Sequence, residues 1–390
     1  MQFCRTSWMP MGFLRASIND AWHGAAAAVL AVYAMASPAA MAGPALLFDA
    51  TDGKVLYAED QDDVWYPASL TKMMTAYLAF EALKQGTLQL DTKLTQTELS
   101  HSQPPSKIGM PIGAQMDVEL ALQSLIIKSA NDIAVMLAEG ISGSQEAFVA
   151  RMNATAKRLG MSRTNFANPN GLPAPDQLTT ARDLAKLSGA LLTEYAQFAP
   201  LWGMADMHVG RIRIRTHNAL LKIYEGADGM KTGFTCDSGY NVVATATRDG
   251  HRLVAVVLGE SSGASRSLRA ANLLEHGFQY RVWEEALRPV TLASLEMQPD
   301  ARSTAVSVRD QVTGYACGGR KRPVVAKVRQ KRLEAAKQRQ AAASKTSQAA
   351  PTAAASTAAI PAGSAQPTGG VVPPVTPTAP PGATATPAKK

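Results

Sequence analysis

The sequence has few cysteines, no hydrophobic run long enough to cross a bilayer comfortably, and no internal repeat. Three cysteines in 390 residues cannot define a dense disulfide framework, so a hydrophobic core has to stabilise the fold. The hydrophobic fraction of 46% is enough for such a core. The length allows one large domain or two ordinary ones.

The first 42 residues have the pattern of a secretory signal. Arg5 and Arg15 precede the apolar run 25–36 (AAAAVLAVYAMA), and 40–42 is an A-x-A cleavage site. The alternative is a retained membrane helix, but the run is short for a span and small residues follow it. We therefore expect an exported protein, in the periplasm or on the outer side of the cell envelope, whose mature chain starts near Gly43.

Cleavage there would remove Cys4 and leave two cysteines, Cys236 and Cys317. One disulfide fits this composition, and so do two thiols that are unpaired or paired with other molecules. The sequence leaves these alternatives open.

Acidic residues are nearly missing from the C-terminal part. Residues 316–390 contain twelve basic residues and one acid, Glu334, and so carry a charge of +11. Since the whole chain has a net charge of +8, residues 1–315 carry −3. The basicity therefore belongs to the tail and gives no reason to expect nucleic-acid binding by the folded part.

The middle of the chain alternates between strand-like and helix-like patterns. Two apolar runs around Asp52-Gly53 predict a hairpin, and two β-rich runs joined at Asp249-Gly250 predict another. A further strand is expected in RIRIRT, from residue 211. Helices are expected over 69–85, 118–127, 131–140, 145–159, from Thr179–Asp183 onward, and over 264–276. Strands at both ends with helices between them predict an α+β fold, in which helices flank an antiparallel sheet and a helical region is inserted.

Composition divides the chain into segments. We expect a folded domain over 43–285, a short extension over 286–319, and a basic segment over 320–340. Residues 341–390 are almost wholly Ala, Pro, Thr, Ser and Gly, which predicts a disordered tail.

The segment PASLTKMMTAYLAF raises the first chemical question, because Lys72 lies one helical turn after Ser69 at the edge of an apolar face. A serine hydroxyl needs a nearby base to become a nucleophile, and a buried lysine can act as that base when its pKa is lowered. Taken alone, the pair fits equally a helix cap and a lysine that reaches out to solvent.

Two further motifs follow in order. Ser129-Ala130-Asn131 lies between apolar helical segments, where a helix cap is the structural alternative. Lys231-Thr232-Gly233 opens onto a predicted strand and suits an anionic group docked along its edge, with Gly233 leaving room for a ligand backbone. An ordinary turn is the alternative for this motif.

Together, the three motifs and their flanking segments resemble the serine-type D-alanyl-D-alanine carboxypeptidases, the low-molecular-mass penicillin-binding proteins. The resemblance covers about residues 44–281. Four segments carry it: PASLTKMMTAYLAFEAL, IIKSANDIAVMLAE, NPNGLPAPDQLTTARDLAKL and DGMKTGFT. It implies a β-lactamase-like fold, peptidoglycan stem peptides as substrate, β-lactams as covalent inhibitors, and no metal or cofactor.

The resemblance also implies a role for each motif residue. Ser69 would attack the carbonyl of the penultimate D-alanine, and Lys72 would take its proton. Ser129 would relay a proton to the leaving D-alanine, while Asn131 would hold Lys72 and the substrate amide.

Lys231 and Thr232, beside Gly233, would bind the terminal carboxylate, and the charge of Lys231 would help keep Lys72 neutral. The backbone N–H groups of Ser69 and Phe234 would form the oxyanion hole.

Three other functions share parts of this pattern. A class A β-lactamase needs a loop glutamate between the second and third motifs, and NFANPNGLPAPDQLTTARD contains none. A D-alanyl endopeptidase would use the same chemistry on cross-links. A catalytically idle wall-binding protein would have no need of a lysine beside a serine.

The basic segment 320–340 fits peripheral contact with anionic lipid or wall polymers, and equally a solubilising role.

Overall fold

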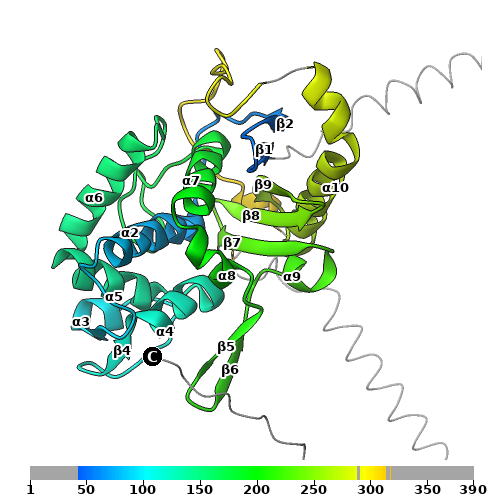
Figure 1. The fold of residues 1–390 in the computed structure, drawn as a ribbon. Coiled ribbons are helices and arrows are strands. Elements are labelled where there is room, and N and C mark those ends of the chain that lie inside the picture. The colour runs from blue at the N-terminus through cyan, green and yellow to red at the C-terminus, as the bar shows by residue number, and fades with distance from the viewer. Residues whose placement is uncertain (1–42, 288–289, 313–316, 318–390) are drawn as a thin grey trace, which may run out of the picture. The chain divides into compact units, whose positions relative to one another are not determined.

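The computed structural model describes residues 43–287, 290–312 and Cys317. The predicted signal, basic segment and tail lie outside the described residues. The described part contains a five-stranded antiparallel sheet with helices on both faces (Figure 1), which confirms the predicted α+β class.

The sheet has the strand order β2-β1-β9-β8-β7. Its strands are β1 (Ala45–Asp49), β2 (Val55–Glu59), β7 (Ala227–Thr235), β8 (Gly239–Arg248) and β9 (His251–Glu260). Strand β1 pairs with both β2 and β9, so strands from the two ends of the domain meet in one sheet. The hairpins predicted at Asp52-Gly53 and Asp249-Gly250 are both confirmed, and β7 forms one edge of the sheet.

Both faces of the sheet are buried. In β1, Leu46 and Phe48 belong to the core on the side of the inserted helices, whereas Ala45 and Leu47 belong to the core under the last helix. Strand residues alternate between faces, so a sheet covered on both sides needs continuous apolar runs such as Leu253–Leu258, all 0% exposed.

The inserted region is helical, as predicted. Its helices are α2 (Lys72–Lys84), α3 (Glu98–His101), α4 (Val118–Gln123), the π-helical turn η2 (Ser124–Lys128), α5 (Asn131–Ser142), α6 (Gln145–Arg158) and α7 (Ala181–Glu194). Helix α2 follows the 3₁₀ turn η1 (Ala68–Thr71), and Thr180 caps α7 by accepting a hydrogen bond from the Asp183 N–H.

Smaller elements connect these parts. They are the hairpins β3 (Lys93–Thr95)–β4 (Gln115–Asp117) and β5 (Asp206–Val209)–β6 (Ile212–Arg215), and the short helices η3 (Ala196–Phe198), α8 (Ala199–Trp202), α9 (Leu220–Ile223) and η4 (Arg309–Gln311). The strand expected in RIRIRT is β6, and it pairs only with β5, outside the main sheet.

Two predicted boundaries are wrong. Helix α10 (Gly263–Leu287) does not end near residue 276 but continues through the aromatic segment FQYRVW, of which Phe278 packs against the core under this helix. A Cβ at Gly277 would lie 2.7 Å from Leu253 Cδ1, so this glycine lets the helix pass close over β9. The Lys231-Thr232-Gly233 motif also does not precede a strand, because it lies inside β7.

Residues 290–312 return along the domain with little regular structure. The Leu292 N–H donates to the Gly53 carbonyl over 2.9 Å, and the Arg302 side chain pairs with Asp63 over 2.5 Å. Farther on, Cys317 forms a disulfide with Cys236, which settles the pairing that the sequence left open.

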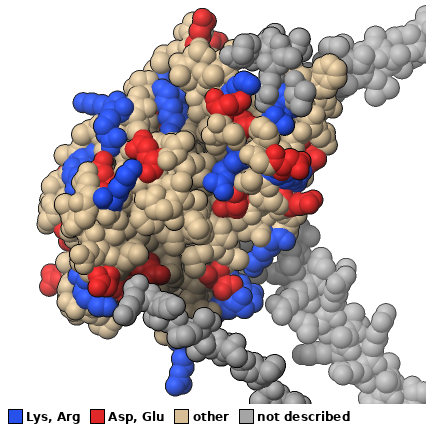
Figure 2. All heavy atoms as spheres, viewed as in Figure 1, with Lys and Arg blue, Asp and Glu red and all other residues tan. Residues whose placement is uncertain are grey.

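The described surface carries mixed charge. Figure 2 shows basic and acidic side chains interspersed over one face of the described residues. Within the same residues, no helix combines the length and the apolar character needed to cross a membrane.

Candidate active site

The structure places Lys72 beside Ser69, as the one-turn spacing predicts. Lys72 Nζ donates a hydrogen bond to Ser69 Oγ over 3.1 Å. Ser69 is half-buried at the end of η1, whereas Lys72 is only 1% exposed. The neighbouring apolar side chains of α2 are fully buried, as expected. A buried lysine amine one turn from a reachable hydroxyl is the arrangement that a base and its nucleophile need.

Two oxygens besides the serine hydroxyl accept from Lys72. They are Asn131 Oδ1 at 2.7 Å and the main-chain carbonyl of Asn170 at 2.5 Å. Burial lowers the pKa of Lys72 well below its usual value, the charge of Lys231 lowers it further, and Asp132 partly opposes both effects. Burial and the charge of Lys231 thus shift Lys72 toward the neutral amine, whose lone pair can take the serine proton.

Ser129 and Asn131 enter the site from the junction between η2 and α5. Ser129 has φ +58°, a left-handed conformation uncommon outside glycine, and it ends η2 so that α5 can begin at Asn131. The Asn131 amide group donates to the Pro104 carbonyl over 2.9 Å while its oxygen accepts from Lys72. The side chain is thereby fixed in one orientation.

Lys231 reaches the same group of residues from β7. Its Nζ donates to Ser129 Oγ over 2.9 Å and to the Thr232 carbonyl over 3.0 Å, and the side chain is 2% exposed. Burial, together with the charge of Arg266, lowers the pKa of Lys231 to about 7. The segment Ser129–Asn131 therefore contacts both lysines, Lys231 through Ser129 and Lys72 through Asn131.

Gly233 lies against η1, the turn that carries Ser69, whereas the sequence predicted that this glycine leaves room for a ligand backbone. A Cβ at Gly233 would lie 3.0 Å from the Pro67 carbonyl oxygen and 3.1 Å from the Ser69 nitrogen. The glycine therefore allows the strand to approach the protein's own backbone beside the serine. Phe234, the next residue, stacks on Tyr240 with ring centroids 4.2 Å apart.

These residues line one cleft with a volume of about 440 Å³. Its walls include Ser69, Ser129, Asn131, Thr232 and Phe234 from the predicted set, together with Asn170, His217, Tyr240 and Arg266. Lys72 and Lys231 lie behind this wall, bonded to Ser69 and Ser129. The structure thus brings all three sequence motifs to one site.

Arg266 and His217 were not anticipated from the sequence. Arg266 is 7% exposed, and its Nε is buried without a hydrogen-bond partner among the described residues. Burial lowers its pKa to about 10, so the guanidinium stays charged at neutral pH. Burial also lowers the pKa of His217, and so do the charges of Lys231, Lys128 and Arg266. Neither residue belongs to a recognisable motif, because only the fold brings it to the cleft.

The described residues contain no group of three or more His, Cys, Asp and Glu side chains that could hold a metal ion. The groups that they do provide at the cleft are hydroxyls, two buried lysine amines and the charged guanidinium of Arg266. Such a set suits acyl transfer to a serine and recognition of an anion.

Comparisons with known proteins agree with this chemistry. A family model described as D-alanyl-D-alanine carboxypeptidase (Peptidase_S11) matches residues 31–262. DacF of Bacillus subtilis, a curated D-alanyl-D-alanine carboxypeptidase, is 34% identical over 260 residues, which are 65% of this chain and 67% of DacF. The chain spans between 60 and 67% of the length of three such relatives.

Solved structures are similar as well. Penicillin-binding protein 5 of Haemophilus influenzae has a TM-score of 0.60 and 35% identity, covering 62% of this chain and 72% of that chain. Penicillin-binding protein D2 of Listeria monocytogenes, in a cefotaxime-bound form, has a TM-score of 0.56 and 31% identity, covering 61% of this chain and 97% of that chain.

Proposed function

Because the chain belongs to the D-alanyl-D-alanine carboxypeptidase family, we propose that it removes the terminal D-alanine from peptidoglycan stem peptides through an acyl-enzyme on Ser69. The observation that carries this proposal is the contact of 3.1 Å between Ser69 Oγ and the buried amine of Lys72. The same geometry supports β-lactams as covalent inhibitors, since a similar penicillin-binding protein has been solved in a cefotaxime-bound form.

In the acylation step, neutral Lys72 accepts the Ser69 proton as Oγ attacks the carbonyl carbon of the penultimate D-alanine. The negative charge that forms on the carbonyl oxygen is stabilised by the backbone N–H groups of Ser69 and Phe234. A pair of fixed donors of this kind contributes a few kcal/mol to the transition state. Gly233 allows β7 to lie close to the Ser69 nitrogen, as an oxyanion hole shared between these two segments would require.

The proton then has to reach the nitrogen of the leaving D-alanine. Ser129 lies at hydrogen-bond distance from Lys231, and Asn131 joins it to Lys72 through the start of α5. Ser129 donates its proton to the leaving nitrogen and regains the proton that Lys72 took from Ser69, so that Lys72 is neutral again when the C–N bond has broken and D-alanine departs. Water then attacks the acyl carbonyl, and Lys72 takes the proton of this water. Lys72 returns the proton to Ser69 Oγ as the ester bond breaks, and the shortened peptide is released.

The terminal carboxylate binds at the cationic end of the cleft. Lys231 and Thr232 were assigned to it from the sequence, and the buried guanidinium of Arg266 adds a second cation that stays charged. Among the residues that the structure describes, Arg266 has no carboxylate partner, and a buried cation without one is costly, so a ligand carboxylate is the natural partner.

We also propose that the protein acts outside the cytoplasm. The signal-like pattern of residues 1–42 supports this location, and so does the Cys236–Cys317 disulfide, since disulfides persist in oxidising compartments. Contact of the basic segment 320–340 with a membrane or with the wall stays a prediction.

Two peptides that share one sequence test the function. The first ends in D-alanyl-D-alanine with a free carboxylate, and in the second that carboxylate is amidated. We expect rapid release of D-alanine from the first peptide and at least about a tenfold loss of kcat/KM for the second, because a charge-assisted bond to the carboxylate contributes about 1.5–3 kcal/mol. Ser69→Ala should release nothing from either peptide. Efficient cleavage of an internal D-alanyl cross-link, with no D-alanine released from the peptide that has a free carboxylate, would favour the endopeptidase function instead.

A further inference from the structure

The hairpin β5–β6 is a separate two-stranded sheet that projects from the domain (Figure 1), and none of the steps above uses it. Its inner face is apolar, because Met207 is buried and Val209 and Ile214 pack against the core. Both strands contact η2, the turn that ends one residue before Ser129. His217, two residues after β6, lines the catalytic cleft. The hairpin is therefore fixed beside the cleft.

The outer face and the tip of this hairpin carry positive charge. Opposite residues of two paired strands share a face, and the pairs on this face are His208 with Arg213 and Asp206 with Arg215. Arg211 occupies the turn, and all three arginines are exposed. Arg213 pairs with Asp206 over 2.5 Å. Within the part of the chain that the structure describes, neither Arg211 nor Arg215 has an ion-pair partner. Their charges are thus open to a partner outside the domain.

This positive charge contrasts with the rest of the domain. Residues 43–315 contain 25 basic and 29 acidic residues, a net charge of −4, whereas residues 206–215 contain three arginines and one aspartate, a net charge of +2. The other residues of the range 43–315 therefore carry −6. Figure 2 shows basic side chains at the end of the molecule where the hairpin projects. A basic projection on an acidic domain selects an anionic partner.

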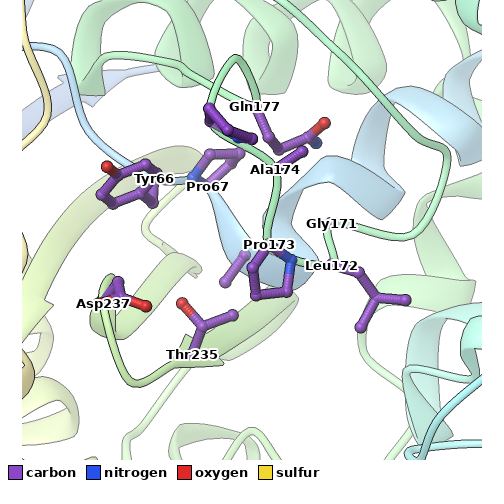
Figure 3. A pocket seen from close by; sticks show the side chains of 11 residues that line it. Tyr66, Pro67, Gly171, Leu172, Pro173, Ala174, Gln177, Thr235 and Asp237 are labelled. Atoms are coloured by element: carbon purple, nitrogen blue, oxygen red, sulfur yellow. The ribbon is translucent and has the colours of Figure 1, made fainter.

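The surroundings of β7 also differ in charge from one end to the other. Near Thr235, at the end of the strand, Asp237 is the one charged residue among the side chains around the hollow in Figure 3. Earlier in the strand, His217 lies within the field of Lys231 and Arg266, whose charges lower its pKa together with burial. Strand β6 leads directly to His217, so the hairpin extends the cationic side of the cleft.

We propose that the hairpin β5–β6 binds carboxylate groups of the peptidoglycan polymer, on stem peptides that neighbour the one in the cleft. The inference rests on the proposed carboxypeptidase function, which makes this polymer the substrate. Stem peptides present carboxylates repeatedly along the polymer, and a guanidinium group matches the geometry of a carboxylate. A second contact with the same polymer raises the effective concentration of stems at the cleft. The protein therefore prefers stems in the polymer over free peptides.

The first test measures retention of the full chain on purified, insoluble peptidoglycan at about 0.01 M ionic strength, where screening is weak. We define the hairpin variant as Arg211→Gln, Arg213→Gln and Arg215→Gln together. It should bind about 3- to 150-fold more weakly than wild type, since each exposed ion pair contributes a factor of about 1.4–5. The difference should shrink at about 0.5 M ionic strength. Amidation of the polymer's carboxylates should abolish it.

The second test measures D-alanine release from the polymer and from a soluble D-alanyl-D-alanine peptide. The hairpin variant should have a raised KM and an unchanged kcat on the polymer, because only binding of neighbouring stems is lost. Both constants for the soluble peptide should stay within about twofold of wild type. Activity on the soluble peptide, together with the melting temperature, shows that the variant is folded.

The matched control variant replaces Lys84, Lys93 and Lys157 with glutamine. These lysines are exposed on α2, β3 and α6, so the control removes the same charge from other elements of the domain. It should bind the polymer and release D-alanine like wild type. The basic segment 320–340 is present in all three proteins, so its own contribution to binding cancels in the comparison.

Equal retention of wild type and the hairpin variant would overturn the proposal. An equal loss in the hairpin and control variants would also overturn it, because net charge alone would explain the binding. A difference that survives amidation would exclude carboxylates as the partner. If the hairpin variant lost binding to vesicles of anionic phospholipid and kept binding to peptidoglycan, the hairpin would be a membrane-binding surface instead. The failure of the proposed function would look different, because wild type would release no D-alanine from either substrate.

Discussion

Replacing Lys231 with methionine separates the two roles that we propose for this residue, which are binding of the substrate carboxylate and lowering of the pKa of Lys72. The change keeps most of the side-chain volume and removes a cation that is 2% exposed and bonded to Ser129 Oγ. The loss of a charge-assisted bond of about 1.5–3 kcal/mol to the substrate carboxylate lowers kcat/KM by about 10- to 150-fold.

The same change alters the pH dependence of acylation. The charge of Lys231 is the second cause, after burial, of the low pKa of Lys72, so its removal raises the pKa of Lys72. A base with a raised pKa stays protonated to higher pH, and the rising limb of the acylation profile moves upward. In wild type, the rate also falls above about pH 7 as Lys231, whose pKa is about 7, loses its proton. Lys231→Met should lack this falling limb.

The assay is stopped-flow acylation by a fluorescent penicillin, together with D-alanine release, between pH 5 and pH 10. Lys128→Met is the matched control, since Lys128 is half-buried and precedes Ser129 but does not contact Lys72 in any hydrogen bond that the structure describes. The Lys128→Met variant should leave the pH profile of acylation unchanged. An unchanged acylation rate and an unchanged pH profile in Lys231→Met would refute this reasoning. Lys231 would then not be the group that binds the substrate carboxylate.

Three further predictions follow from the structure. Asn131→Asp places a carboxylate beside the Lys72 amine, so acylation at pH 7 should fall by at least about tenfold and recover as the pH rises. Replacing both Cys236 and Cys317 with serine opens a loop with a sequence separation of 81, which costs up to about 4.5 kcal/mol in the chain-entropy model and should lower the melting temperature in calorimetry. Truncation before residue 341 should change neither the melting temperature nor activity on a soluble peptide, and a drop of several degrees would show that the tail packs on the domain.

The sequence predicts the parts of the site that are close along the chain or belong to motifs. Ser69 and Lys72 are one turn apart, so local geometry alone brings them together. Ser129, Asn131 and Lys231 are more than fifty residues from that pair, and they could be placed only because the three motifs resemble those of one family.

Other parts depend on tertiary structure and have no signal in the sequence. The Asn170 carbonyl accepts from Lys72 as a main-chain atom, which any residue type provides. Arg266 lies in an ordinary helical segment and becomes a buried cation only because α10 begins beside Tyr240 of β8, at the wall of the cleft. Helix α10 continues past its predicted end, and no pattern in the sequence signals this, because the close approach of Gly277 to Leu253 on β9 is a tertiary contact.

The central claim is that Ser69 is the nucleophile, and mass spectrometry of the protein after exposure to penicillin tests it most directly. The account predicts one penicilloyl adduct per chain, located on the peptide that contains Ser69, and none on Ser69→Ala with an unchanged melting temperature. An adduct on another residue, or persistent labelling of the folded Ser69→Ala variant, would contradict it.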